Sequence, residues 1–138
     1  MMRGRKGVKK RVRTILIGII IIVFVYLQWG RDVQVYNSHI GENKNYCSED
    51  ITIIANKIWI IDKEKFAHDM VQKSIDNSFK EVKFSYDLRQ PNELCITVYT
   101  NTLRYWLSES DFIVRFTQAE NGEYNILNNP EKFIMSIE

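Results

Sequence analysis

The chain has 138 residues, which suit one small domain with an anchor and leave no room for a large multidomain enzyme. Its net charge of +2 conceals a strong asymmetry. Seven basic and no acidic residues precede Thr14, whereas the part after Gly30 carries a net charge of −5. A basic tail and an acidic domain are therefore separated by an apolar segment, and the average charge describes neither of them.

The apolar segment covers residues 14–30, and we expect it to cross a membrane. Its 17 uncharged residues lie at the short end of the roughly 17–25 that span a hydrocarbon core. It is apolar on all sides, whereas a surface helix of a soluble domain has one polar face. Arg13 can extend its charge back to the head groups, and Tyr26 and Trp29 are aromatic residues that prefer the membrane interface.

The basic tail, residues 1–13, orients this span, because Lys and Arg are enriched on the cytoplasmic side of a membrane. We therefore expect a cytoplasmic N-terminus and a domain outside the cell membrane. The tail is short and has no aromatic residues for base stacking, so we expect it to set orientation and not to bind nucleic acid.

A cleaved signal peptide is the alternative to a permanent anchor. Signal peptides have a shorter apolar stretch and a cleavage site of small residues. The residues from Leu27 to Arg31 contain no such site. The sequence therefore favours an uncleaved signal anchor and leaves an exported, cleaved protein as the second reading.

The next segments predict a linker, a strand and a helix. Residues 31–50 are polar with little periodicity, which indicates a linker, and the domain is expected to cover 51–138. The β-branched stretch 51–61 predicts a buried strand, or two strands with a turn near Asn56. Asp62 is a suitable N-cap for a following helix. That helix has apolar or small residues at helical spacing, namely Phe66, Ala67, Met70, Val71, Ser74, Ile75, Ser78 and Phe79.

After the helix the apolar period changes to two, which predicts a meander of strands. The predicted strands are 81–87, 93–100, 111–118, 123–127 and 132–138, with a hairpin turn at Asn121–Gly122. The inward residues are expected to be Val82, Phe84 and Tyr86, then Leu94, Ile96 and Val98, then Phe112, Val114 and Phe116, and finally Phe133, Met135 and Ile137. Residues 101–110 fit a strand, a short helix or a loop.

These elements predict an α+β fold, with one amphipathic helix packed on an antiparallel sheet of about four to six strands. This outline is similar to cystatin-like and NTF2-like sheet-on-helix domains. The likeness is one of outline only and implies no activity. Three alanines against nineteen isoleucines and eleven asparagines indicate an AT-rich, bacterial genome.

Residues that carry chemistry are few. No nucleophile, phosphate-loop or dinucleotide motif is present in the sequence, and we predict no catalytic residue, no metal site and no cofactor. The neighbouring carboxylates Glu49–Asp50 and Glu109–Asp111 are expected to be solvated loop charges. Cys47 and Cys95 lie outside the membrane, where a disulfide is permitted, and the sequence leaves open whether they are bonded.

The segment 101–110 is the best candidate for a binding surface. If Leu103, Tyr105 and Leu107 face inward, Arg104 and Trp106 face outward, and an exposed Trp beside Arg is typical of an interaction hot spot. The alternative is that Trp106 completes the core, as we expect for Trp59. The candidate binding residues are therefore Arg104, Tyr105 and Trp106.

The function that these features favour is non-catalytic. We expect a membrane-anchored subunit of a bacterial envelope machine that presents a protein-binding domain at the membrane surface. Its partners would be the lipid bilayer and another envelope protein. A domain that binds a small ligand or catalyses a reaction in a cystatin- or NTF2-like pocket is the alternative.

Overall fold

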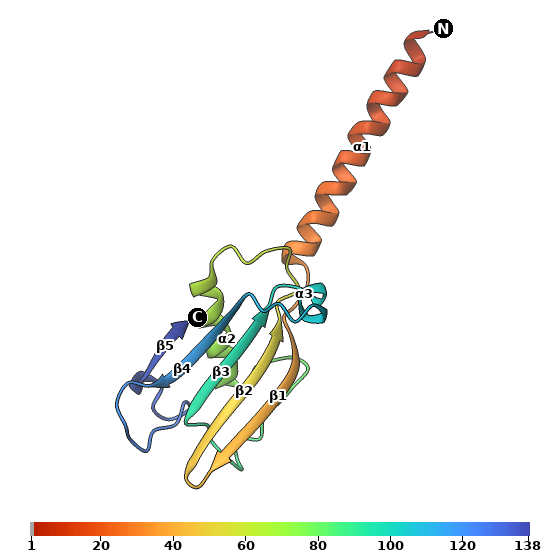
Figure 1. Ribbon diagram of the computed structural model, residues 1–138. Helices are drawn as coiled ribbons and strands as arrows, with labels where there is room; N and C mark the ends of the chain where they lie inside the picture. The colour runs from red at the N-terminus through yellow and green to blue at the C-terminus, as the bar shows by residue number, and fades with distance from the viewer. Residues whose placement is uncertain (1) are drawn as a thin grey trace.

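The computed structural model describes residues 2–138, with side chains from Gly4 onward, so the first residue of the predicted tail lies outside the described part. A long N-terminal helix, α1 (Met2–Trp29), leads into a five-stranded sheet. The strands are β1 (Gln34–Asn43), β2 (Tyr46–Ile54), β3 (Glu93–Tyr99), β4 (Phe112–Gln118) and β5 (Phe133–Ile137), and they lie in sequence order. Figure 1 shows α1 projecting away from one end of this sheet.

The sheet is mixed, and the expectation of an antiparallel sheet is wrong at one place. β2 and β3 are parallel, and the other three neighbouring pairs are antiparallel. Parallel neighbours need a long crossover, and the chain between β2 and β3 contains helix α2 (Lys63–Asp76). The predicted α+β class and strand number are confirmed.

The helix α2 begins and ends where its capping residues dictate. The carboxylate of Asp62 accepts a hydrogen bond from the Lys65 amide, as predicted for the N-cap. Asn77 ends the helix in the left-handed conformation, with φ of 53°. Five residues of the predicted apolar side are buried, namely Phe66, Ala67, Met70, Val71 and Ser74.

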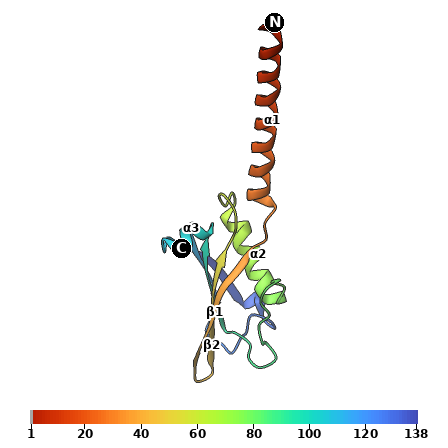
Figure 2. The same cartoon turned by 90° about the vertical axis from the view of Figure 1, so that its right-hand side faces the viewer.

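One hydrophobic cluster contains the buried residues of α2 and of the strands. The rings of Phe66 in α2 and Phe112 in β4 meet edge to face, with centres 6.2 Å apart. Figure 2 shows α2 beside one face of the sheet and the short helix α3 (Thr102–Trp106) beside the other. The two faces of the sheet therefore have different neighbours.

The predicted linker, residues 31–50, is wrong, because it contains β1 and the first half of β2. β1 is an edge strand in which only Val35 is buried. An edge strand with polar residues on both faces shows no hydrophobic alternation, so its sequence is typical of a loop. The predicted strand 51–61 also ends early, at Ile54, and the predicted turn follows at Asn56, which has a φ of 55°.

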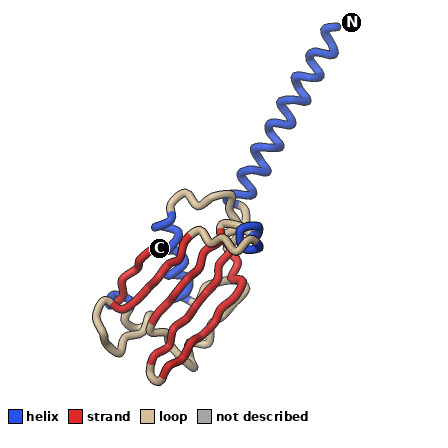
Figure 3. The backbone as a smooth tube through the Cα atoms, viewed as in Figure 1, coloured by secondary structure: helices blue, strands red, loops and turns tan. Residues whose placement is uncertain are grey.

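Two predicted strands, 81–87 and 123–127, are loops and turns in the structure (Figure 3). Asn77 satisfies the backbone of Phe84 in both directions, with bonds of 2.8 and 2.9 Å, so this segment needs no strand partner. The carbonyl of Tyr124 accepts bonds from the side-chain amides of Asn92 and Gln118. The apolar residues of both segments contribute to the core from irregular backbone, and β5 takes the place beside β4.

Candidate functional site

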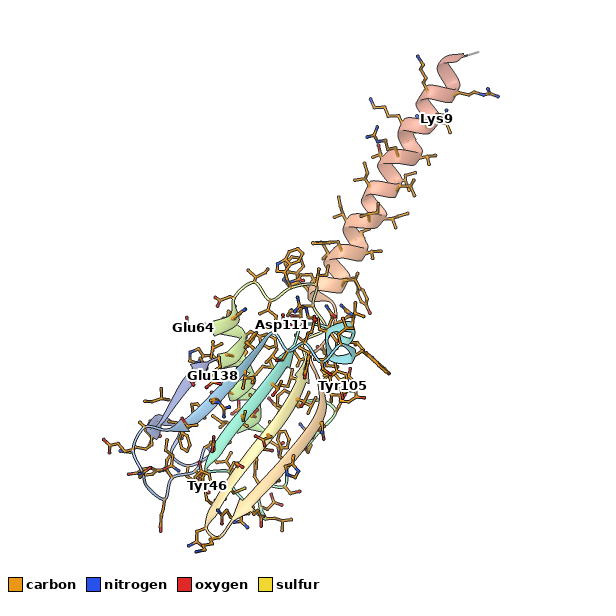
Figure 4. All side chains as sticks on the ribbon, in the orientation of Figure 1. Lys9, Tyr46, Glu64, Tyr105, Asp111 and Glu138 are labelled. Atoms are coloured by element: carbon orange, nitrogen blue, oxygen red, sulfur yellow. The ribbon has the colours of Figure 1, made fainter. Side chains whose placement is uncertain are left out.

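The candidate binding segment forms the helix α3 at the end of the sheet nearest α1. The side chain of Asn101 caps it by accepting a hydrogen bond of 3.1 Å from the Arg104 amide. The carboxylate of Asp111 accepts bonds from the amide and the hydroxyl of Thr100, which precedes the helix. Figure 4 shows Tyr105 and Asp111 at this end of the sheet and Tyr46 at the opposite end. The helix is short, but hydrogen bonds hold both the residue before it and its first turn.

Tyr105 of α3 packs against two tyrosines of the sheet. The ring of Tyr105 lies 4.2 Å from that of Tyr36 in β1 and 5.3 Å from that of Tyr99 in β3. Loss of solvent, followed by the neighbouring phenol of Tyr36, raises the pKa of Tyr105. Sequence analysis missed Tyr36 because its segment was interpreted as a linker.

The predicted binding residues lie together, but not in the alternating pattern of a strand. Trp106 is 75% exposed, and Arg104 forms an ion pair of 3.4 Å with Asp111. Leu103 and Leu107 are exposed, so the arrangement in which they face inward is not present, and the alternative that Trp106 completes the core is wrong. The reason is the helical backbone, which directs residues two positions apart to different sides.

A second cluster joins α1 to the domain, at the loop 55–61, which we call the joint loop. The side-chain amide of Gln28 donates to the carbonyl of Trp59 at 2.8 Å and accepts from the amides of Ile58 and Trp59 at 3.0 and 3.3 Å. The ammonium group of Lys57 donates to the backbone carbonyl of Gln28. Gln28 is buried, and sequence analysis did not single it out because a glutamine near the end of an apolar helix is unremarkable in sequence.

The joint loop also contacts the apolar part of α1. The rings of Phe24 and Trp59 lie 5.4 Å apart. Trp59 is 45% exposed, so the expectation that it completes the core is wrong. The predicted interface residues Tyr26 and Trp29 are exposed on the last turns of α1, and Arg13 is exposed nearer its start. Trp29 lines a cleft with Ile60 and Ile61 of the joint loop, at the foot of α1.

One carboxyl group is buried in the centre of the sheet. Glu49 in β2 is fully buried, contrary to the expected solvated loop charge, because it shares the alternating face of Cys47 and Ile51. Burial raises its pKa to about 7, and the hydrogen bond from Tyr86 opposes this only in part. Its second oxygen has no partner among the described residues.

The hydrogen bonds of Tyr86 indicate which form Glu49 takes. The Tyr86 hydroxyl lies 2.8 Å from the carbonyl of Ser74 and 3.2 Å from Glu49. A phenol has one proton to donate, so both contacts are satisfied only when Glu49 carries a proton of its own. The group can therefore hold a proton near neutral pH.

Cys47 and Cys95 are free thiols in the structure. Cys47 faces the core, while Cys95 aligns with Asp50, which points to the other face of the sheet. Burial raises the pKa of both thiols, which disfavours the reactive thiolate.

Shallow clefts follow α2. One of about 440 Å³ lies between the foot of α1 and α2 and is lined by two lysines, Lys57 and Lys65, and two aspartates, Asp62 and Asp69, besides apolar residues. Within residues 2–138, no group of three or more His, Cys, Asp or Glu side chains is placed to hold a metal ion. No protein-family model, curated protein or solved structure matches this chain.

Proposed function

We propose that the chain is a single-pass membrane protein whose domain, on the outer side of a bacterial cell membrane, binds another envelope protein. One helix, over residues Gly4–Trp29, is long and apolar enough to span a membrane, with a mean hydropathy of 2.2 in its most apolar window. Only 6% of that window is buried against the rest of the chain, as expected for a helix that lipid surrounds. The seven basic residues of the tail support a cytoplasmic N-terminus.

The joint between α1 and the domain supports an anchor that is retained. Cleavage near Gly30 would remove Gln28 and leave the backbone groups of Ile58 and Trp59 without their partners. Unpaired backbone groups in a folded domain are costly, so these hydrogen bonds to Gln28 favour a protein that keeps its first 30 residues. An intact mass without the first 30 or so residues would overturn this part of the proposal.

The domain itself is proposed to have two layers, with α2 packed on the sheet. The shared hydrophobic cluster and the contact of Phe66 with Phe112 support this arrangement. The same cluster counts against a ligand pocket between helix and sheet, because Phe66, Met70, Phe84 and Phe112 are all buried within it.

The observation that carries the binding function is the exposure of Trp106 on a helix with a fixed start. Leu103 and Leu107 on the same segment are exposed as well, contiguous apolar patches mark interaction sites, and Trp beside Arg dominates many interfaces. The mechanism would be tethering, because an anchor raises the effective concentration at the membrane and a weak interface then suffices. The partner would be a protein surface with an apolar pocket for the indole ring.

The test is a pull-down of the full-length protein from its native membrane, in mild detergent, with a tag after Glu138. We expect a stoichiometric partner, and we expect Trp106→Ala to weaken its recovery by roughly tenfold or more, as truncation of a hot-spot residue does. Leu88→Ala is the matched control, because Leu88 is exposed at the far end of the domain. The absence of a partner, or equal loss in both variants, would reject the proposed interface.

A further inference from the structure

We propose that the joint loop inserts into the outer leaflet of the membrane, so that the domain rests on the bilayer by a second contact besides α1. This inference depends on the proposal that α1 spans the membrane. The loop carries the large apolar side chains of Trp59 and Ile61, which are 45% and 68% exposed. The occupant of this surface is lipid, for three reasons.

The first reason is depth. Trp59 packs against Phe24, which lies five residues before Trp29 on α1. At about 1.5 Å per residue, Phe24 is roughly 7–8 Å deeper in the membrane than Trp29. The uncharged segment, 14–30, is only about 25 Å long as a helix, against a hydrocarbon core of about 30 Å. Its last turn therefore cannot stand above the bilayer, and Trp59 lies at or below the interface.

The second reason is that the backbone of this loop has partners inside the protein. Backbone groups that enter lipid must find them there, because no water is present to replace them. Gln28 supplies an acceptor to two loop amides and a donor to one loop carbonyl. Gln28 is buried and serves three backbone groups, so it gives the loop partners that it would need inside lipid.

The third reason is the chemistry around the loop, which fits hydrocarbon and interface and not a charged partner. Lys57 of the loop and Lys65 of α2 line the adjoining cleft, where Asp62 and Asp69 balance them. The cleft thus carries no net charge that would select an anionic ligand. Insertion should be driven by the apolar side chains, and zwitterionic lipid should suffice.

The first experiment measures tryptophan quenching in full-length protein reconstituted into phosphatidylcholine vesicles. Three variants each keep one tryptophan, at Trp29, Trp59 or Trp106, and the others become Phe. Lipids brominated close to the head group quench fluorescence only by contact in the membrane. We expect Trp29 and Trp59 to be quenched to a similar extent, and Trp106 to be quenched less and to remain accessible to aqueous iodide.

The outcomes separate the two proposals. Quenching of Trp29 without Trp59 would overturn the inserted loop and leave the membrane span intact. Quenching of neither residue would overturn the span and, with it, the loop. Strong quenching of Trp106 as well would keep the inserted loop and assign α3 to lipid, which would reject the protein interface proposed above.

A second experiment tests Ile61 without using fluorescence. Ile61→Cys and Leu88→Cys are compared in a background of Cys47→Ala and Cys95→Ser, since both positions carry exposed aliphatic side chains at opposite ends of the domain. In the same vesicles, a water-soluble maleimide should label position 61 about tenfold more slowly than position 88, relative to the denatured protein. Equal labelling would overturn the inference.

Discussion

At each end of the sheet a side-chain amide bonds to loop backbone, but the surfaces around the two amides differ. At the end near α1, the amide side chain of Gln28 joins the joint loop to that helix. At the far end, the amide side chain of Asn92 accepts from the amide of Cys47 at 2.9 Å and donates to the carbonyl of Tyr124 at 2.7 Å. One side-chain amide thus organises the loops at each end.

The side chains around these amides differ sharply. Exposed aromatic side chains, Trp59 and Trp106, lie at the near end with the Arg104–Asp111 pair, whereas the far end carries Arg89–Glu42 and Tyr46–Glu93 and has Leu88 as its exposed aliphatic residue. Burial, followed by the hydrogen bond to Glu93, raises the pKa of Tyr46 to about 12. The fold needs a side chain that holds the loops together at each end, whereas the exposed side chains depend on what surrounds each end.

The largest expected effect comes from removing the side-chain amide at the end near α1. Gln28→Leu leaves three loop backbone groups unpaired, and we expect the free energy of unfolding to fall by roughly 3–4 kcal/mol. Hydrogen exchange should rise at residues 57–60 and stay unchanged at the far end. Asn92→Leu is the matched control, with faster exchange near Cys47 and Tyr124 instead. If exchange rose equally at both ends of the sheet in each variant, the two ends would not be independent.

The next effect lies between the ends, at Glu49. Its pKa of about 7 in the folded state exceeds its ordinary value of 4.5, so its protonated form favours folding. Stability should therefore be fully present below about pH 4.5 and decrease as pH rises through 7, by on the order of 3 kcal/mol in total. Denaturant titrations at pH 5 and pH 9 measure this difference. Glu49→Gln should abolish it, and Asp50→Asn should retain it.

A smaller effect is expected at the start of α3. Asp111→Ala removes charge-assisted bonds to Thr100 and the ion pair with Arg104, and we expect a loss of about 2 kcal/mol in local stability. Hydrogen exchange at the amides of 100–107 measures this loss. Glu109→Ala, a nearby carboxylate, should leave these amides unchanged, and an equal effect would exclude Asp111 as the fixing residue.

The smallest effect is expected at the surface pair of Arg115 and Glu138. The two groups are 3.1 Å apart, and their side chains are 40% and 57% exposed. Arg115→Ala should change the free energy of unfolding by less than about 1 kcal/mol, and the remaining effect should vanish in high salt. If Arg115→Ala lowered the free energy of unfolding as much as Asp111→Ala, this pair would contribute to the stability of the fold and could not be treated as a solvated surface pair.

The sequence predicts those elements that have a regular spacing of apolar residues or a recognisable capping residue. The apolar segment, the helix α2 with its cap at Asp62, and the strands β3, β4 and β5 all follow from spacing. β1 could not be predicted, because an edge strand needs no apolar period and its partner supplies the register. The parallel pairing of β2 with β3 could not be predicted either, since the false strand at 81–87 offered a nearer antiparallel partner.

The sites divide in the same way. Arg104, Tyr105 and Trp106 were singled out because aromatic and basic residues stand out in composition, and the structure places them together on α3. Gln28, Tyr36 and Glu49 were missed, because each is defined by what lies opposite it in space. For Glu49 a signal existed: Cys47, Glu49, Ile51 and Ile53 alternate, which places all four on one face of a strand.

If α1 spans a membrane as proposed, the connection at Gln28 makes the thickness of that membrane a mechanical variable for this protein. A short helix in a bilayer adjusts to thickness by changing its tilt. Because α1 is bonded to the domain and not joined by a free tether, the whole sheet turns with it. With β1 about 33 Å long, a change in tilt of ~10° sweeps the far hairpin sideways by roughly 6 Å. The lipid composition around α1 would thereby set where the far end of the domain points above the membrane.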